Sequence, residues 1–559
     1  MSQEEALRSS ARRSGRFRDL LVHLAMKGAW NRFHEAGRAL PDGDAEGHLT
    51  YRLLGLTHAG EDAPWVMEHI CGAQDSFFHY ALTKFLLGRG DLKDALAVAK
   101  DLLGKDRYDT LPLNLVAKYA ASRNSKAVAL RLIENSIAIN PDQRDMFLLR
   151  EALAVGGDAG SVDPKSFRTY LEVAPKHVAV TFYVPAYNVE VYIRETVEAL
   201  VAQSYPLAEI IIVDDGSRDG TLEITREYPV RVVSFEENKG LAAARNTGFR
   251  EAATPFVGSV DADVCADPDY TVHIMMEFEN ASQDLAGVSG RLIEKHLDTP
   301  GDRWRARHLP QGWYPRRMYF DAPPPEGQEG PDSGLNRGFF LNGCNNVFRK
   351  DHVLEVGGYN EKYQTNSEDA MMCMALRYSG RHLAFTRSAV ARHTRRDTLQ
   401  SVIKTAWNYG FWGRQEGGLY RDAPTLLSNL HYVINHANAI LAGDMNERFT
   451  DQIYADFLLL FHWALLDMTH AVKEGILTAE QAAYIQHAIL APTELLDRQF
   501  GGGLTTRVKQ DSAHLLIAAQ PRRESLPPEL AALVDGFVTA LSRDFETYPA
   551  RVYFTLTSP

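Results

Sequence analysis

Two pairs of carboxylates in this sequence have the residue types and spacing to do chemistry. Asp261 and Asp263 are one residue apart and follow the apolar run 256–260, while Glu368 and Asp369 are adjacent. Carboxylates this close repel one another unless a cation lies between them, and a hard divalent cation with oxygen ligands would also bind phosphate. The first pair therefore indicates a metal site. The second indicates either a general base or the acidic start of a helix.

Polar segments follow four apolar runs of the chain and include the first of these pairs. The segments are PAYN, DDGS, NKGLAAARN and DAD, which come after residues 178–184, 210–213, 230–233 and 256–260. Continuous apolar runs of this length suit strands buried on both faces of a parallel sheet, and the helical stretches between them predict βαβ units. Ligands of such sheets bind beyond the carboxyl ends of the strands. We therefore expect the four polar segments to meet at one edge.

These segments resemble the family 2 glycosyltransferases, whose catalytic domain has the GT-A fold, a Rossmann-like α/β fold with a mostly parallel sheet. The resemblance covers about residues 177–400 and runs through PAYN (185–188), VDDGSRDGT (213–221), NKGLAAARN (238–246), DAD (261–263), Ser367-Glu368-Asp369 and His393. It implies an inverting, metal-dependent hexosyl- or N-acetylhexosaminyltransferase. The expected donor is a nucleotide diphosphate sugar, with UDP-sugar favoured, and the expected acceptor is a hydroxyl of a protein or glycan.

The resemblance assigns nucleotide-binding roles to five residues. Pro185 and Tyr187 are expected to line the base pocket. Asp215 is expected to hydrogen-bond the uracil or ribose. Gly240 and Arg245 are expected to lie against the nucleotide and its phosphates.

The resemblance also assigns the metal and catalytic roles. Asp261 is expected to contact the ribose or the metal, Asp263 to bind Mn²⁺ or Mg²⁺ directly, and His393 to complete the metal shell. A surface or core histidine is the alternative for His393. Asp369 is the expected general base, with Glu368 beside it near the acceptor. One base suffices for inversion, and a divalent cation would neutralise the charge on the leaving diphosphate.

The rest of the chain is expected to form two helical regions. Residues 1–175 are rich in Ala and Leu, residues 176–400 form the expected GT-A domain, and residues 401–559 form a C-terminal helical domain. A weak 34-residue period at about 78–142 relates Gly90, Ala95 and Ala99 to Asn124, Ala129 and Ile133, and resembles tetratricopeptide repeats. Two unrelated helical hairpins remain an alternative. An arginine-rich insert at 296–340 is expected to be irregular and to bind a phosphate or glycan.

Composition limits the partners. With 60 basic and 72 acidic residues the net charge is −12, which argues against nucleic acid as a partner. No apolar run reaches the length of a transmembrane helix, whereas the basic N-terminus leaves peripheral membrane contact open. Four cysteines without a CxxC pair are typical of a cytoplasmic protein.

The acceptor is open at this point. Repeat arrays present concave peptide-binding surfaces, so a protein acceptor, flagellin or another surface protein, is one hypothesis. The absence of a QxxRW motif favours single addition over polymer synthesis. A different class of function is a non-catalytic scaffold that binds a sugar nucleotide and recruits a partner protein through its repeats.

Overall fold

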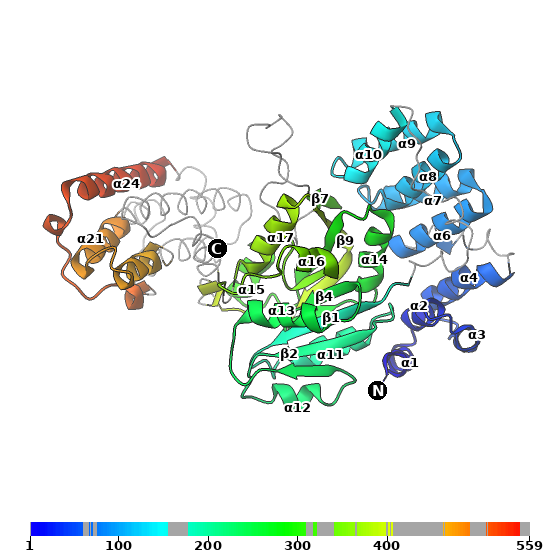
Figure 1. The fold of residues 1–559 in the computed structure, drawn as a ribbon, viewed down its shortest axis with the longest axis horizontal. Coiled ribbons are helices and arrows are strands. Elements are labelled where there is room, and N and C mark those ends of the chain that lie inside the picture. Colours follow the sequence, from blue (N-terminus) through cyan, green and yellow to red (C-terminus); the bar gives the residue numbers. More distant parts are fainter. Residues whose placement is uncertain are drawn as a thin grey trace, which may run out of the picture. The chain divides into compact units, whose positions relative to one another are not determined.

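The structure is a computed structural model of the chain. It describes residues 2–59, 75–154, 177–308, 317–320, 340–363, 366–398, 464–491 and 512–547, with a few isolated positions besides. The chain divides into two compact units, and each is described by itself (Figure 1). The first unit comprises Met1–Lys295 and Leu309–Arg395, and the second comprises His296–His308 and Arg396–Pro559.

A mixed sheet, nine-stranded within the described residues, is the centre of the first unit. Its strand order is β3-β2-β1-β4-β8-β6-β9-β5, and β7 pairs with β9. The strands are β1 (Val180–Ala186), β2 (Glu209–Asp214), β3 (Arg231–Ser234), β4 (Phe256–Val260), β5 (Val264–Ala266), β6 (Leu285–Glu294), β7 (Met318–Phe320), β8 (Asn345–Arg349) and β9 (His382–His393).

The expected βαβ units are present in the half of the sheet formed by β3, β2, β1 and β4. These four strands pair in parallel, and the helices between them are α11 (Ile193–Val201), α12 (Thr221–Thr225) and α13 (Leu241–Glu251). All seven residues of β1 are buried, because alternate side chains enter different cores. Phe182 packs in the cluster that contains Leu200 of α11, whereas Tyr183 packs in the cluster that contains Phe249 of α13.

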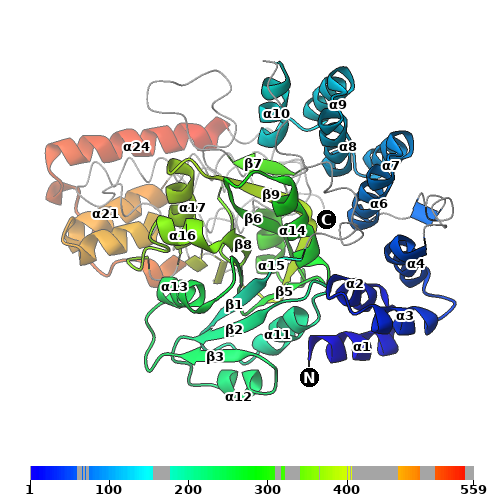
Figure 2. The same ribbon diagram turned by 45° about the vertical axis from the view of Figure 1, so that its right-hand side comes forward.

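The other half of the sheet brings the ends of β6 and β9 together. β8 is antiparallel to β4 and β6, whereas β6 and β9 are parallel and place Glu294 opposite His393 at their carboxyl ends. α14 (Tyr270–Asn280) packs on β9 and β6. α16 (Lys350–Glu355) and α17 (Glu368–Tyr378) contact each other in the same unit (Figure 2).

The expected N-terminal helical region is also present. Its helices are α1 (Gln3–Ser14), α2 (Arg18–Met26), α3 (Trp30–Arg38), α4 (Ala45–Ala59), α6 (Ser76–Arg89), α7 (Leu92–Lys105), α8 (Leu111–Ser122), α9 (Lys126–Ile139) and α10 (Arg144–Ala154). α7 and α9 begin 34 residues apart. The equivalent residues Gly90 and Asn124 have positive φ, +86° and +55°. Each follows a helix of the region, and residues in this left-handed conformation commonly end helices.

One face of this helical region contacts the sheet domain. On α6, the Tyr80 hydroxyl donates to Glu279 Oε2 at 2.6 Å, and Lys84 Nζ donates to Glu279 Oε1 at 2.7 Å. On α8, Lys118 Nζ donates to the carbonyl of Asn280. Glu279 and Asn280 end α14, so α6 and α8 hold the helix that packs on β9.

The described part of the second unit is helical, as expected. Thr478 and Gln481 form a capping box at the start of α21 (Ala479–Leu490), and residues 464–473 are helical before it. Two short 3₁₀ helices, η5 (Ala513–Leu515) and η6 (Arg523–Ser525), precede α24 (Pro528–Thr547). Within the described chain, no helix has the length and apolar character needed to cross a bilayer.

The prediction of an irregular arginine-rich insert is wrong in part. Residues 300–308 form α15 (Pro300–His308), whose Arg305 Nη1 lies 2.7 Å from Asp397 Oδ2 within the second unit. Arg317, just before β7, is only 4% exposed. These two arginines therefore have partners inside the fold instead of forming a free cationic surface. Residues 309–316 and 321–339 of the insert lie outside the described residues.

Candidate active site

A buried arginine links two of the polar segments to the acidic pair at 368–369. Arg245 projects from α13 and is 2% exposed. Its Nη2 lies 2.9 Å from Asp261 Oδ1, and its Nε lies 3.2 Å from Glu368 Oε1. The carbonyl of Gly343 accepts a further hydrogen bond from Arg245 Nη1. A Cβ at position 343 would lie 2.6 Å from Nη2, so only glycine leaves room for the guanidinium.

The two adjacent acids open α17 beside this arginine. Asp369 Oδ2 accepts from the backbone N–H of Gly343 at 2.8 Å. The N-cap position belongs to Ser367, which has φ +73° and makes no side-chain capping bond. A non-glycine residue in this conformation carries backbone strain, and it turns the chain immediately before Glu368. Asp369 Oδ1 also accepts from the N–H of Ala370 at 2.7 Å. The carboxylate thus bonds both its own helix start and the Gly343 loop, which fits the helix-capping alternative as well as a role in the site.

Burial changes the proton affinity of this pair. It is the main cause that raises the pKa of Glu368 to about 7, and the neighbouring Asp369 carboxylate adds to the effect. Burial also raises the pKa of Asp369, while Arg245 and the N–H of Gly343 oppose the rise. A carboxylate with raised pKa is a stronger base near neutral pH than an ordinary aspartate.

Asp263 and His393 meet at the ends of two neighbouring strand segments. His393 Nε2 lies 3.2 Å from Asp263 Oδ2, and Nδ1 donates to Glu294 Oε2 at 3.0 Å. A carboxylate that accepts from Nδ1 orients the ring so that Nε2 could ligate a metal ion in place of its proton, which is the usual arrangement behind a metal-ligating histidine. Arg395 Nη1 also lies 3.8 Å from Asp263 Oδ2. The carboxylate oxygens suit Mn²⁺ or Mg²⁺, whereas the imidazole suits a transition-metal ion, so the donor set favours Mn²⁺ over Mg²⁺.

Asp261 lies on the arginine side of the DAD segment. Burial raises its pKa, Arg245 lowers it, and the nearby carboxylates of Asp263 and Asp369 raise it again. The structure therefore places Asp261 between the arginine cluster and the pair formed by Asp263 and His393.

Asp215 organises the loop that precedes α13. Its carboxylate accepts from the backbone N–H groups of Lys239, at 2.6 Å, and Gly240, at 3.0 Å. Gly240 has φ +93°, a conformation that glycine adopts without strain. Burial raises the pKa of Asp215, and these two hydrogen bonds oppose the rise. Asp215 thus holds the segment from which Arg245 projects.

The first two polar segments are tied together at the sheet edge. Pro185 lies opposite Val213 in the register of β1 and β2, and Tyr187 just beyond is 47% exposed. The N–H of Asn188 donates to Ser217 Oγ at 2.9 Å. The two strand ends therefore form one surface on which the Tyr187 ring is accessible.

Sequence reasoning missed two residues of this site. Glu294 lies more than 30 residues from any recognised motif, and only the register of β6 and β9 places it beside His393. Asn246 stands in the segment NKGLAAARN, but its role is clear only in three dimensions. Its Nδ2 donates to the carbonyl of Tyr359 at 2.8 Å and to Glu361 Oε1 at 2.9 Å.

Among the described residues, one group of three potential ligands has metal-compatible spacing, but it already contains a cation. Ligand atoms of Asp75, Asp269 and His273 lie within 4.8 Å of one another. Arg18 Nη2 lies 2.5 Å from Asp75 Oδ2 and 3.3 Å from Asp269 Oδ2. The guanidinium neutralises these carboxylates, so we interpret the group as an ion-pair network between α2, α6 and α14.

Comparison with known proteins identifies the domain that carries the site. Residues 181–354 match the family model described as glycosyl transferase family 2. The chain contains a family 2 glycosyltransferase domain. The match spans β1 to α16 and includes Arg245, Asp261 and Asp263, whereas Glu368, Asp369 and His393 lie beyond it.

Curated relatives resemble the family 2 domain over part of their length. The teichuronic acid biosynthesis glycosyltransferase TuaG of Bacillus subtilis, described as putative, is 42% identical over 133 residues, which are 22% of this chain and 53% of TuaG. The glycosyltransferase GlyA of Streptococcus pneumoniae is 37% identical over 111 residues, 19% of this chain and 16% of GlyA. The chain thus spans about half or less of these relatives.

Solved structures include distant matches. TarS of S. aureus aligns with a TM-score of 0.33 and 15% identity, over 66% of this chain and 55% of that chain. The mannosyltransferase PcManGT of Pyrobaculum calidifontis, solved with GDP-Man and Mn²⁺, aligns with a TM-score of 0.31 and 17% identity, over 67% and 84% of the two chains.

Proposed function

We propose that this chain is an inverting, metal-dependent glycosyltransferase that moves a sugar from a UDP-sugar to a hydroxyl of an acceptor. The observation that carries the proposal is the convergence of Asp261, Glu368 and Asp369 around the buried guanidinium of Arg245. Three carboxylates gathered beside one buried guanidinium carry an excess of negative charge, which suits a site where one carboxylate acts as a general base and a divalent cation binds next to the others.

Asp369 is the proposed general base. Its raised pKa and its fixed orientation on the N–H of Gly343 suit a carboxylate that takes a proton from the acceptor hydroxyl. As that proton moves to Asp369, the hydroxyl oxygen forms a bond to the anomeric carbon from the opposite side. The bond from that carbon to the diphosphate oxygen breaks, and the nucleoside diphosphate leaves with the electron pair. One displacement of this kind inverts the configuration.

Asp263 and His393 are the residues that would hold Mn²⁺ or Mg²⁺, with Asp261 beside them. When bound there, the ion would neutralise charge on the leaving diphosphate. The hydrogen bond from His393 Nδ1 to Glu294 supports this assignment, because it leaves Nε2 directed at Asp263.

For the acceptor we favour a glycan. TuaG is named for teichuronic acid biosynthesis, and other relatives are named poly-β-1,6-N-acetyl-D-glucosamine synthase. The hypotheses of a protein acceptor, such as flagellin, and of a recruiting scaffold were motivated by the concave surface that helical repeats present. The helical region also has a second use in this chain, because Tyr80, Lys84 and Lys118 contact α14 of the sheet domain.

The test is donor turnover by the full chain with a panel of UDP- and GDP-sugars, with and without Mn²⁺. We expect nucleotide release from a UDP-sugar that requires the metal and is lost in Asp263→Ala. The exposed Asp298→Ala serves as the matched control. Tight binding of a UDP-sugar without release, in the presence of candidate glycan acceptors, would contradict the enzyme and favour the scaffold.

A further inference from the structure

Two consecutive residues of α13 contact different parts of the chain around the proposed base. Arg245 contacts Glu368 at the start of α17. The next residue, Asn246, is 8% exposed and contacts the linking segment, residues 356–363, which follows α16 and leads toward α17. Because α17 begins with Glu368 and Asp369, the contacts of Asn246 bear on where the proposed base lies.

The Asn246 carboxamide makes three hydrogen bonds to the linking segment. Its Oδ1 accepts from the backbone N–H of Tyr359 at 2.8 Å, and its Nδ2 donates to the carbonyl of the same residue at 2.8 Å. Nδ2 also donates to Glu361 Oε1 at 2.9 Å. An amide side chain satisfies all three partners, whereas a carboxylate, which has no donor, satisfies only the Tyr359 N–H.

The linking segment approaches Asn246 closely because two glycines turn it there. Gly357 and Gly358 have positive φ, +86° and +75°, and their backbone N–H groups donate to carbonyls at the end of α16. A Cβ at position 358 would lie 2.6 Å from Asn246 Oδ1. The chain therefore leaves α16 and reaches the Asn246 side chain directly.

The Tyr359 side chain connects the linking segment to α17. It is 2% exposed and packs in one core cluster with Met372 and Leu376 of α17. The guanidinium carbon of Arg245 lies 5.8 Å from the centre of the Tyr359 ring. Thus α17 packs with a residue whose backbone N–H and carbonyl are both bonded to Asn246.

We propose that Asn246 is a positioning residue for sugar transfer, which holds the linking segment so that Asp369 meets the acceptor hydroxyl at the correct distance from the donor. This role rests on the proposed function. α13 begins at the loop that Asp215 holds, so one helix relates the donor-binding segments to the base. A displaced base slows the chemical step and leaves the donor contacts in place. Loss of the Asn246 amide therefore lowers kcat without raising the KM of the donor.

The test compares Asn246→Asp with the parent chain. Aspartate keeps the size of the side chain and the bond from the Tyr359 N–H. It cannot donate to the Tyr359 carbonyl, and its charge repels Glu361. Adding Glu361→Gln removes this repulsion and supplies a donor to the introduced carboxylate, so the double variant tests whether the lost contact is the cause.

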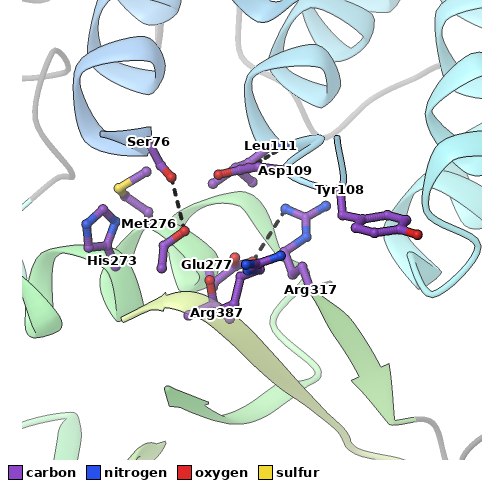
Figure 3. A pocket seen from close by; sticks show the side chains of 11 residues that line it. Ser76, Tyr108, Asp109, Leu111, His273, Met276, Glu277, Arg317 and Arg387 are labelled. Atoms are coloured by element: carbon purple, nitrogen blue, oxygen red, sulfur yellow. Dashed lines mark hydrogen bonds and ion pairs between the residues drawn. The ribbon is translucent and has the colours of Figure 1, made fainter. Parts of the chain in front are cut away.

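Gln143→Glu is the matched control for the cost of such a change to the fold. Gln143 is also a buried amide, 2% exposed, and its Nε2 donates to the carbonyls of Ser136 at 2.9 Å and Asn140 at 2.7 Å. Its Oε1 accepts from Arg317 Nη2 at 2.6 Å, beside the small cavity between the helical region and the sheet domain (Figure 3). The control thus replaces a comparable amide that contacts neither α13 nor α17.

Two measurements on the full chain separate positioning from transfer. Initial rates of UDP release are measured with Mn²⁺ and UDP-glucose, UDP-galactose or UDP-N-acetylglucosamine. Hydrogen–deuterium exchange is measured on peptides that cover Tyr359 and the start of α17, and needs no turnover. If the parent chain releases UDP from no donor, the proposed function fails, and exchange alone decides whether Asn246 holds the linking segment.

We expect Asn246→Asp to lower kcat about 100-fold, the effect of a displacement of about 1 Å, with donor KM and UDP affinity unchanged. Exchange at Tyr359 and the start of α17 should be faster than in the parent chain or Gln143→Glu. The double variant should regain about tenfold in kcat. Equal kcat in Asn246→Asp and Gln143→Glu, a parallel loss of UDP affinity, unchanged exchange, or no recovery in the double variant would overturn the proposal.

Discussion

Replacing Glu294 by Gln tests the metal site through a residue that would not touch the metal. Glu294 is 1% exposed, and its Oε2 accepts from His393 Nδ1 at 3.0 Å. Glutamine has the same shape and can still accept this hydrogen bond, but it removes the negative charge that favours the Nδ1–H tautomer and raises the basicity of Nε2.

The expected loss of Mn²⁺ affinity is small because glutamine keeps a hydrogen-bond acceptor for His393. Removing such a supporting partner costs about 10- to 100-fold in metal affinity. Because the glutamine side chain retains an acceptor, we expect the lower end, about tenfold weaker Mn²⁺ binding, or about 1.4 kcal/mol. Asp263→Ala removes a proposed ligand and should abolish measurable Mn²⁺ binding.

The assay is calorimetric titration of Mn²⁺ in the presence of UDP, which needs no acceptor. Glu195→Gln is the matched control, because Glu195 is 53% exposed and pairs with Lys295 at the surface. Asp75→Asn probes the acidic group that Arg18 already neutralises, and should leave Mn²⁺ affinity unchanged. If Glu294→Gln binds Mn²⁺ as well as Glu195→Gln does, while Asp263→Ala has lost it, the carboxylate on His393 has no role in metal binding and the reasoning fails.

Three further predictions concern catalysis and stability. Asp369→Asn should bind UDP normally but lose transfer by several orders of magnitude, measured as initial rates, and near-normal turnover would remove Asp369 as the base. Arg245→Met leaves Asp261 and Glu368 without their buried counter-charge, and we expect urea denaturation to show a free energy of unfolding lower by about 3–5 kcal/mol. A decrease as small as the one caused by substituting an exposed arginine would contradict this. Burial lowers the pKa of His23 to about 4 from 6.5, so the unfolded chain binds the proton more readily and stability falls as the pH drops from 6.5 to 4. Between a pH above 6.5 and a pH below 4, this residue lowers the free energy of unfolding by roughly 3 kcal/mol in total. His23→Leu should lack this part of the pH dependence.

The sequence was sufficient to predict the parallel half of the sheet because its signal is local. Each strand there is a continuous apolar run, and each is followed directly by its polar segment, so the positions of Asp215, Arg245 and Asp261 at one edge follow from βαβ topology alone. The paired helices around Gly90 and Asn124 could likewise be predicted from short-range turn and packing patterns.

Contacts between distant segments could not be predicted in this way. The pairing of Glu294 with His393 depends on a parallel register between strands separated by almost ninety residues. The helical state of residues 300–308 depends on a partner, Asp397, that is equally far along the chain. Neither relation leaves a periodic or compositional signal, so the insert resembled an irregular loop and nothing in the sequence drew attention to Glu294.

The contacts of the helical region with α14 also bear on what that region does. Lys84 is 5% exposed and pairs with Glu279, and Tyr80, which shares Glu279, is 1% exposed. Glu279 is partly exposed, at 23% of its side chain, so this pair adds little net stability, but its two directed hydrogen bonds favour one docking geometry over others. α14 in turn packs on β9, the strand that ends at His393. A helical region held in this way fixes the strand that carries the candidate metal ligand, which an independently mobile recruiting module would not require.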